Sequence, residues 1–128
     1  MNSMSTLRYE VDADGIATVT FDEPGSPVNT MCIAWQEDLQ RLVAQIVQDA
    51  PSIKGIVLQS AKTSFFAGAD LKGLMRGSEA DAQQSFDWIQ RMKKAFRTLE
   101  TAGKPVVACL NGTALGGGMG IATIVERV

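Results

Sequence analysis

The chain has 128 residues, of which 45% are hydrophobic and 20% are charged, as in an ordinary globular protein. This length predicts one domain, residues 1–128, with enough apolar residues to bury a core. Twelve basic and fourteen acidic side chains leave a net charge of −2, which argues against a nucleic-acid-binding protein because such proteins need a basic face. The chain has no histidine, which excludes Ser-His-Asp triads, Cys-His pairs and histidine metal sites. Any chemistry must therefore use carboxylates, main-chain amides, lysine or a cofactor.

The cysteines and the apolar runs indicate a cytoplasmic protein. Cys32 and Cys109 each lie in an apolar stretch, so we expect two small buried hydrophobic residues rather than a disulfide. Residues 1–10 are polar and lead directly into an alternating pattern, which does not fit a secretory signal. No run of about 18 apolar residues occurs, so no membrane span is expected.

The first predicted elements form a β-hairpin. Alternating residues predict strands at Leu7–Val11 and Ile16–Phe21, joined by a turn at Asp12–Gly15. The next eight residues contain two prolines and predict a loop, because proline cannot continue a strand ladder. Asp22 and Glu23, which open this loop, are expected to be turn residues.

A helix and a buried strand follow the loop. Apolar residues recur at helical spacing over Met31–Asp49, which predicts an amphipathic helix with Trp35 on its packed face. Thr30 is the expected N-cap of this helix. The apolar run Ile53–Gln59 predicts a strand buried in a sheet.

A second amphipathic helix is predicted over Glu79–Ala102, where Ser78 and Asp81 resemble a capping box and Gly103 ends the helix. Trp88 is expected to pack against the core. The apolar face of this helix comprises Phe86, Ile89, Met92, Phe96 and Leu99. The expected solvated face carries Arg91, Lys93, Lys94 and Arg97.

The last predicted elements are a buried strand, Pro105–Leu110, and a helix that starts near Met119. Strands therefore alternate with amphipathic helices along the chain. This order predicts an α/β layered fold.

Two clusters of small residues stand where a buried strand gives way to a helix, at residues 66–70 and 111–118. Such turns expose main-chain N–H groups, and a helix N-terminus adds its dipole, so both could hold an anionic oxygen. A tight connection without any ligand is the alternative. Gly112 and Gly117 match two glycines of a P-loop, but Gly118 and Met119 replace the required Lys and Ser/Thr. No G-x-G-x-x-G motif is present in this turn, so neither nucleotide motif fits.

These two turns and the segments around them resemble the crotonase, or enoyl-CoA hydratase, superfamily. Within that superfamily the chain looks most like the N-terminal hydratase region of fatty-acid oxidation complex α-subunits, multifunctional proteins of fatty-acid β-oxidation. The resemblance implies the α/β ClpP/crotonase-like fold, of which this chain would be the N-terminal portion. The segments that carry it are Phe21–Thr30, Lys54–Leu58, Phe65–Leu71, Lys104–Ala108 and Asn111–Gly118.

The resemblance implies an acyl-CoA thioester as the substrate. Its carbonyl oxygen would bind the main-chain amides of Ala69 and Gly117, which form an oxyanion hole, and the main chain of Ala67 would contact the CoA adenine. Further expected substrate-binding residues are Gly68, Asp70 and Gly116. No metal or redox cofactor is implied. The expected partners are further copies of the chain or β-oxidation complex subunits.

The chain departs from the family at the catalytic carboxylates. The family hydrates trans-2-enoyl-CoA to 3-hydroxyacyl-CoA with two glutamates; the first corresponds to Gly120, and the second would lie beyond Val128. Glu126 matches neither and is expected to be a solvent-facing helix residue. We therefore expect a hydratase-type domain that is inactive as this chain. The alternatives are a non-catalytic acyl-CoA-binding or interaction fragment, and another crotonase reaction such as isomerisation or thioester hydrolysis.

Overall fold

The computed structural model describes residues 4–67, 82–112 and 126–127, and its central feature is a mixed five-stranded sheet in the order β1-β2-β3-β4-β5. The first two strands form the predicted antiparallel hairpin, and the other neighbours pair in parallel. The strands are β1 (Leu7–Val11), β2 (Ile16–Phe21), β3 (Gly55–Ser60), β4 (Val106–Ala108) and β5 (Glu126–Arg127).

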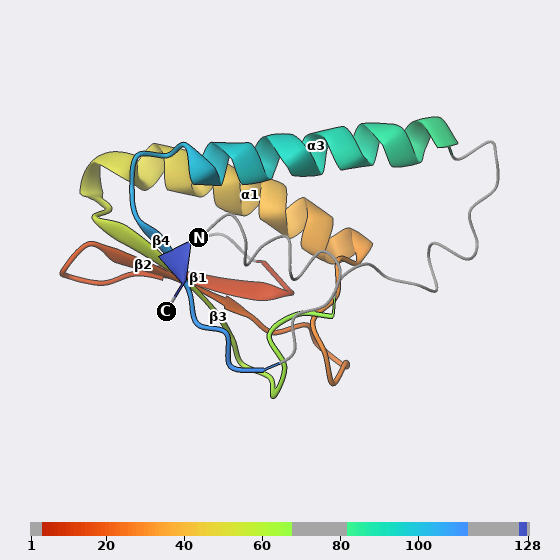
Figure 1. Cartoon of the computed structure of the whole chain (residues 1–128), viewed down its shortest axis with the longest axis horizontal. Coiled ribbons are helices and arrows are strands. Elements are labelled where there is room, and N and C mark those ends of the chain that lie inside the picture. Colours follow the sequence, from red (N-terminus) through yellow and green to blue (C-terminus); the bar gives the residue numbers. More distant parts are fainter. Residues whose placement is uncertain (1–3, 68–81, 113–125, 128) are drawn as a thin grey trace.

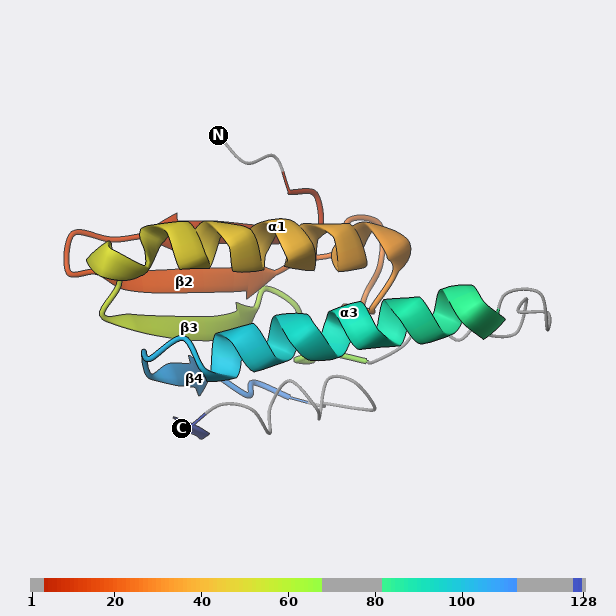
Figure 2. The same cartoon turned by 90° about the horizontal axis from the view of Figure 1, so that it is seen from above.

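Two helices, α1 (Ile33–Asp49) and α3 (Ala82–Glu100), lie side by side on one face of this sheet (Figures 1 and 2). A short 3-10 helix, η1 (Ala50–Ser52), with Pro51 in its first turn, connects α1 to β3. The layered α/β arrangement predicted from the sequence is therefore confirmed. Because β2, β3 and β4 run parallel, the loops that follow them all leave from the same edge of the sheet.

The core lies between the sheet and the two helices. Alternate residues of the central strands face it, including Ala17 and Val19 of β2 and Ile56 and Leu58 of β3. An aromatic cluster continues this core toward the edge from which the loops leave. It comprises Phe21, Trp35, Phe65, Phe66 and Phe96, with ring centroids 5.1–6.5 Å apart along the chain of contacts. Both Phe65 and Phe66 are completely buried, so they anchor the loop after β3.

Several boundaries differ from the sequence predictions. Helix α1 begins at Ile33 with Cys32 as its N-cap, because the Thr30 hydroxyl instead donates to the carboxylate of Glu23. Strand β4 is shorter than the predicted strand Pro105–Leu110. The predicted capping box at Ser78 and Asp81 lies outside the described residues.

The predicted faces of the second helix are partly correct. Met92 and Leu99 are buried, but Phe86 and Ile89 are 56% and 43% exposed. Figure 2 shows that the N-terminal end of α3 extends beyond the end of α1 and beyond the strands of the sheet, which fits this exposure. The four basic residues predicted on the solvated face are exposed, as expected. Trp35 and Trp88 both pack against the core, as predicted.

The C-terminal prediction of a helix is wrong at Glu126, which lies in β5 and pairs with Val107 of β4. The free edge of β4 offers main-chain hydrogen-bond partners that a parallel strand can use. The residues between Gly112 and Glu126 lie outside the described part of the chain.

A buried carboxylate holds the start of the chain against α1. Asp38 is 2% exposed, and its Oδ2 atom accepts hydrogen bonds from the Thr6 main-chain nitrogen at 2.9 Å and the Thr6 hydroxyl at 2.6 Å. Arg41, one turn later in the helix, forms a 3.3 Å ion pair with the other oxygen. Every oxygen of this carboxylate therefore has a partner, as a buried charge requires.

We expect Asp38→Ala to lower the free energy of unfolding by about 2–4 kcal/mol, because it leaves two buried donors of Thr6 without an acceptor. Urea denaturation measures the change. The matched control is Glu37→Ala at the exposed neighbouring position, which should stay within about 0.5 kcal/mol of the wild type. Equal losses in both variants would contradict the structural role of Asp38.

Candidate functional site

The candidate site lies at the edge of the sheet where β2, β3 and β4 end. Three loops leave this edge, comprising residues 22–30, 61–67 and 109–112, and they lie close together in Figure 1 as orange, green and blue segments. The second and third loops lead toward the two small-residue turns that the sequence analysis singled out. The contacts between these loops therefore determine the positions at which the two turns begin.

Asn29 joins the first loop to the second. It is 1% exposed, and its side-chain nitrogen donates to the Ser60 hydroxyl at 2.9 Å and the Phe65 carbonyl at 3.1 Å. Its side-chain oxygen accepts from the main-chain nitrogen of Glu23 at 3.0 Å. Its main-chain oxygen accepts from the nitrogen of Ala67 at 2.8 Å. One buried residue thus fixes both the start of the first loop and the end of the second.

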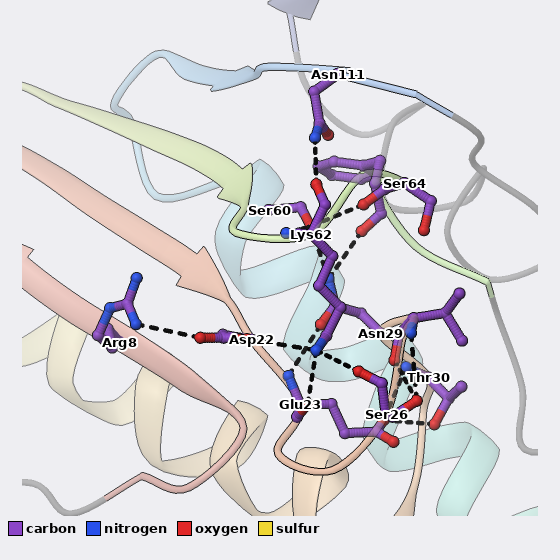
Figure 3. A network of polar contacts seen from close by, with 12 residues as sticks. Arg8, Asp22, Glu23, Ser26, Asn29, Thr30, Ser60, Lys62, Ser64 and Asn111 are labelled. Atoms are coloured by element: carbon purple, nitrogen blue, oxygen red, sulfur yellow. Dashed lines mark hydrogen bonds and ion pairs between the residues drawn. The ribbon is translucent and has the colours of Figure 1, made fainter.

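Lys62 makes a second connection between the same loops (Figure 3). Its ammonium group donates to the main-chain oxygens of Glu23 at 2.7 Å and Ser26 at 2.6 Å. It also lies 3.3 Å from a carboxylate oxygen of Asp22, which pairs on its other side with Arg8. Asp22 and Glu23 were expected only to be turn residues. In the structure both also contribute to a polar network.

The third loop contacts the second directly. The side-chain nitrogen of Asn111 donates to the main-chain oxygen of Lys62 at 2.6 Å. The next residue, Gly112, passes so close to the main chain that a Cβ atom there would overlap the carbonyl oxygen of Thr63. The entries of the two small-residue turns therefore lie side by side, although they are far apart in the sequence.

Of the predicted site residues, only Ala67 is described. Its N–H group is already used by Asn29, so a ligand contact at its main chain would fall to the carbonyl oxygen. The other predicted residues lie outside the described residues. They are Gly68, Ala69, Asp70, Gly116, Gly117 and Gly120.

Sequence reasoning missed Asn29, Lys62 and Asn111, which organise the three loops. The only local signal was their position, since each is a polar residue next to the end of a strand or inside a proline-containing loop. The partners that join one loop to another are 31 to 49 positions away in the sequence, so no local pattern identifies these contacts.

The cysteines behave differently from each other. Burial is the main cause that raises the pKa of the Cys32 thiol, and the negative charge of Glu23 raises it further, against a main-chain hydrogen bond at Trp35 that lowers it. Cys32 is half-buried and remains protonated at neutral pH, so it is not an activated nucleophile. The expectation of a buried Cys109 is wrong: it lies just after the end of β4, and its side chain is exposed.

Two further expectations concern a metal site and a membrane-spanning helix. Within residues 4–67, 82–112 and 126–127, no cluster of three acidic, cysteine or histidine residues could hold a metal ion. In the same part of the chain, neither helix has the length and apolarity needed to cross a membrane.

Comparison with known proteins gives consistent matches. The sequence model of the enoyl-CoA hydratase/isomerase family matches residues 12–126. The chain is 42% identical over 124 residues to the fatty acid oxidation complex subunit alpha of Shewanella halifaxensis, covering 95% of this chain and 17% of that protein. It is 35% identical over 123 residues to the corresponding subunit of Idiomarina loihiensis, with the same two coverages.

The fold also matches solved structures. An enoyl-CoA hydratase/carnithine racemase from Magnetospirillum magneticum is 30% identical, with a TM-score of 0.81 over 98% of this chain and 46% of that one. These matches confirm the resemblance and the crotonase-type fold expected from the sequence motifs. The chain spans about half the length of this solved structure and 17% of the length of the two curated relatives.

We expect Gly112→Ala to destabilise the protein by about 1–3 kcal/mol, because the added methyl group must push the third loop away from the main chain of Thr63. Urea denaturation measures the loss. Gly55→Ala is the control, since a Cβ atom there would meet its neighbours only at 3.7 and 3.8 Å. A variant at Gly112 as stable as the control would show that the two loops do not pack this closely.

Proposed function

Because the chain belongs to the enoyl-CoA hydratase/isomerase family, we propose that it binds an acyl-CoA thioester and polarises its carbonyl group with main-chain N–H groups. The proposed donors are the amides of Ala69 and Gly117, the two positions that match the oxyanion hole of the family. Gly68, Asp70 and Gly116 would line the same site beside them. The carbonyl of Ala67 would accept a hydrogen bond from the CoA adenine.

The observation that carries this proposal is the direct contact between the second and third loops. Asn111 bonds to the main chain of Lys62, and Gly112 lies against Thr63. Two N–H groups must converge to bind one oxygen. The contact between the loops that lead to Ala69 and Gly117 supports this convergence.

The chemistry follows from where negative charge develops. Addition of water to the β-carbon of an enoyl thioester moves electron density onto the carbonyl oxygen, which becomes an enolate oxygen. Two preorganised N–H groups bind that oxygen more strongly as its charge grows, and one such donor contributes about 10²–10³ in rate. This step needs no metal or redox cofactor.

Gly120 supports a second candidate function, which is acyl-CoA binding without efficient hydration. The resemblance assigns this position to the first catalytic glutamate, and glycine has no group that can move a proton. The loss of one general acid or base slows a reaction by about 10²–10⁴. Another crotonase reaction, with its acid or base at a different position, shares the same thioester site.

The wider setting belongs to the same proposal. The relatives are fatty acid oxidation complex subunits, which supports β-oxidation as the process and other subunits or further copies of the chain as partners. A cytoplasmic location fits the apolar pattern of the sequence.

The test is a calorimetric titration of the full chain with crotonyl-CoA, together with an assay of hydration by loss of the enoyl thioester absorbance. We expect saturable binding and hydration at least about 10²-fold slower than in a family member with glutamate at this position. Gly117→Val should weaken binding at least about tenfold, because a β-branched side chain obstructs the approach of the thioester.

Gly103→Asn serves as the control, since Gly103 has a φ of +78° that asparagine tolerates and no atoms near its side-chain position. Unchanged binding by the Gly117 variant would exclude that amide from the site. Absence of crotonyl-CoA binding by the wild type would end the proposal. Rapid hydration by the wild type would mean that another residue replaces the missing carboxylate.

A further inference from the structure

We propose that Lys62 is a positioning residue for thioester polarisation, which couples the loop after β2 to the loops that lead into both oxyanion turns. The inference rests on the proposed function, because it concerns the same acyl-CoA site. Lys62 itself would not touch the substrate. It would act through the main chain of residues 62–67 and through Asn111.

The ammonium group of Lys62 is placed as an internal cross-link. Its side chain is 12% exposed, whereas lysines such as Lys54 and Lys93 are exposed. An ammonium group has three N–H donors, and here it faces three acceptors: the carbonyls of Glu23 and Ser26 and the carboxylate of Asp22. A buried charge is tolerated only with such complete pairing.

These acceptors belong to the loop of residues 22–30, whose ends are joined by hydrogen bonds of Glu23 with Asn29 and Thr30. Pro24 and Pro27 have no N–H group to donate, and Gly25 adopts a φ of +71° with open space around it. The lysine therefore holds the carbonyls on both sides of Pro24–Gly25 at a fixed position. Asn29 closes the same loop through its hydrogen bond with Glu23, so Lys62 and Asn29 both contact the main chain of Glu23.

The main chain of Lys62 contacts the end of β3 and the loop after β4 (Figure 3). Its nitrogen donates to the Ser60 hydroxyl at 3.0 Å, and that hydroxyl donates to the carbonyl of Ser64 at 2.7 Å. Its carbonyl accepts the 2.6 Å hydrogen bond from Asn111. A single residue thus connects the loop after β2 through its side chain and the loop after β4 through its carbonyl.

This arrangement predicts an effect on polarisation rather than on affinity. Hydrogen bonds to a carbonyl oxygen depend steeply on distance and angle, so a small displacement of one turn weakens them. Most of the affinity for a CoA ester comes from contacts with the rest of the ligand. Loosening the cross-link should therefore lower the polarisation of the bound thioester while binding persists.

The experiment compares the wild type with Lys62→Met, Asn111→Ala, the double variant and Lys54→Met. Methionine keeps most of the length of the lysine side chain but removes its charge and donors. Asn111 is exposed, so its replacement removes the loop contact without a core defect. Lys54→Met is the matched control, because it makes the same substitution at an exposed lysine.

The first measurement uses crotonyl-CoA that is isotope-labelled at the thioester carbonyl, whose infrared band shifts to lower frequency when hydrogen bonds polarise it. We expect Lys62→Met and Asn111→Ala each to lose at least half of the shift seen in the wild type. The dissociation constant should remain within about threefold of the wild-type value, since the remote contacts are intact. The double variant should lose no more of the shift than the more affected single variant, because both act on one connection.

The second measurement needs no ligand. The Ala67 amide donates to the Asn29 carbonyl, so its hydrogen exchange reports how firmly the second loop is held. We expect Lys62→Met to accelerate exchange at Ala67 by about tenfold, as for the loss of a net hydrogen bond. Exchange at Leu42 in α1 should not change, and Lys54→Met should leave both amides unaffected.

The two measurements distinguish a failure of the proposed function from a failure of the positioning role of Lys62. A wild type that binds crotonyl-CoA without any carbonyl shift would overturn the proposed function, and exchange at Ala67 would still decide whether Lys62 holds the loop. A normal shift in the wild type that survives intact in both single variants would overturn the positioning role of Lys62 alone. Equal loss of shift in the Lys54 control would also overturn it.

Discussion

The site depends on one buried side-chain amide, that of Asn29. A carboxamide offers a donor and an acceptor on the same rigid group, and Asn29 uses both: it accepts from the main chain of Glu23 and donates to Ser60 and Phe65. An aspartate could not donate these hydrogen bonds, and a leucine could make none of them. Because the group is 1% exposed, water cannot replace a lost partner cheaply. The relative positions of the loops after β2 and β3 therefore follow from this residue.

An apolar layer beneath these polar contacts makes them effective. Phe65 and Phe66 are fully buried, and the Phe66 ring packs edge-on against Trp35 at 5.1 Å and against Phe21 at 5.5 Å. The second loop is thus held from below by its aromatic side chains and from above by its main-chain hydrogen bonds. A loop held on both sides can present the main chain that follows it in one orientation, which is what electrostatic preorganisation requires.

The sequence predicted the fold well because its signals are periodic and local. Alternation identified the hairpin, and helical spacing identified both long helices with errors of a few residues at their ends. The prediction of Thr30 as N-cap was wrong because Glu23, seven residues earlier, accepts hydrogen bonds from both the hydroxyl and the main-chain N–H of Thr30. Lys62 could not be recognised, because its partners in the other two loops lie 36 to 49 positions away and include main-chain oxygens that any residue type would supply. The candidate residues at the two turns were assigned through family motifs. Such motifs identify positions in the sequence but do not show which residues are in contact.

Binding of a thioester and transfer of its protons require different groups. The chain can therefore have glycine at position 120 and still keep the contacts between the loops. The proposed thioester site consists of main-chain amides, and the loops that lead to it are held by Asn29, Lys62 and the close approach of Gly112 to Thr63. None of these groups donates or removes a proton from the substrate. A carboxylate at position 120 would add a group for proton transfer, while the contacts among the three loops involve other residues. In the proposed mechanism, polarisation of the carbonyl and proton transfer therefore rest on different residues, and one chain can retain the first without the second.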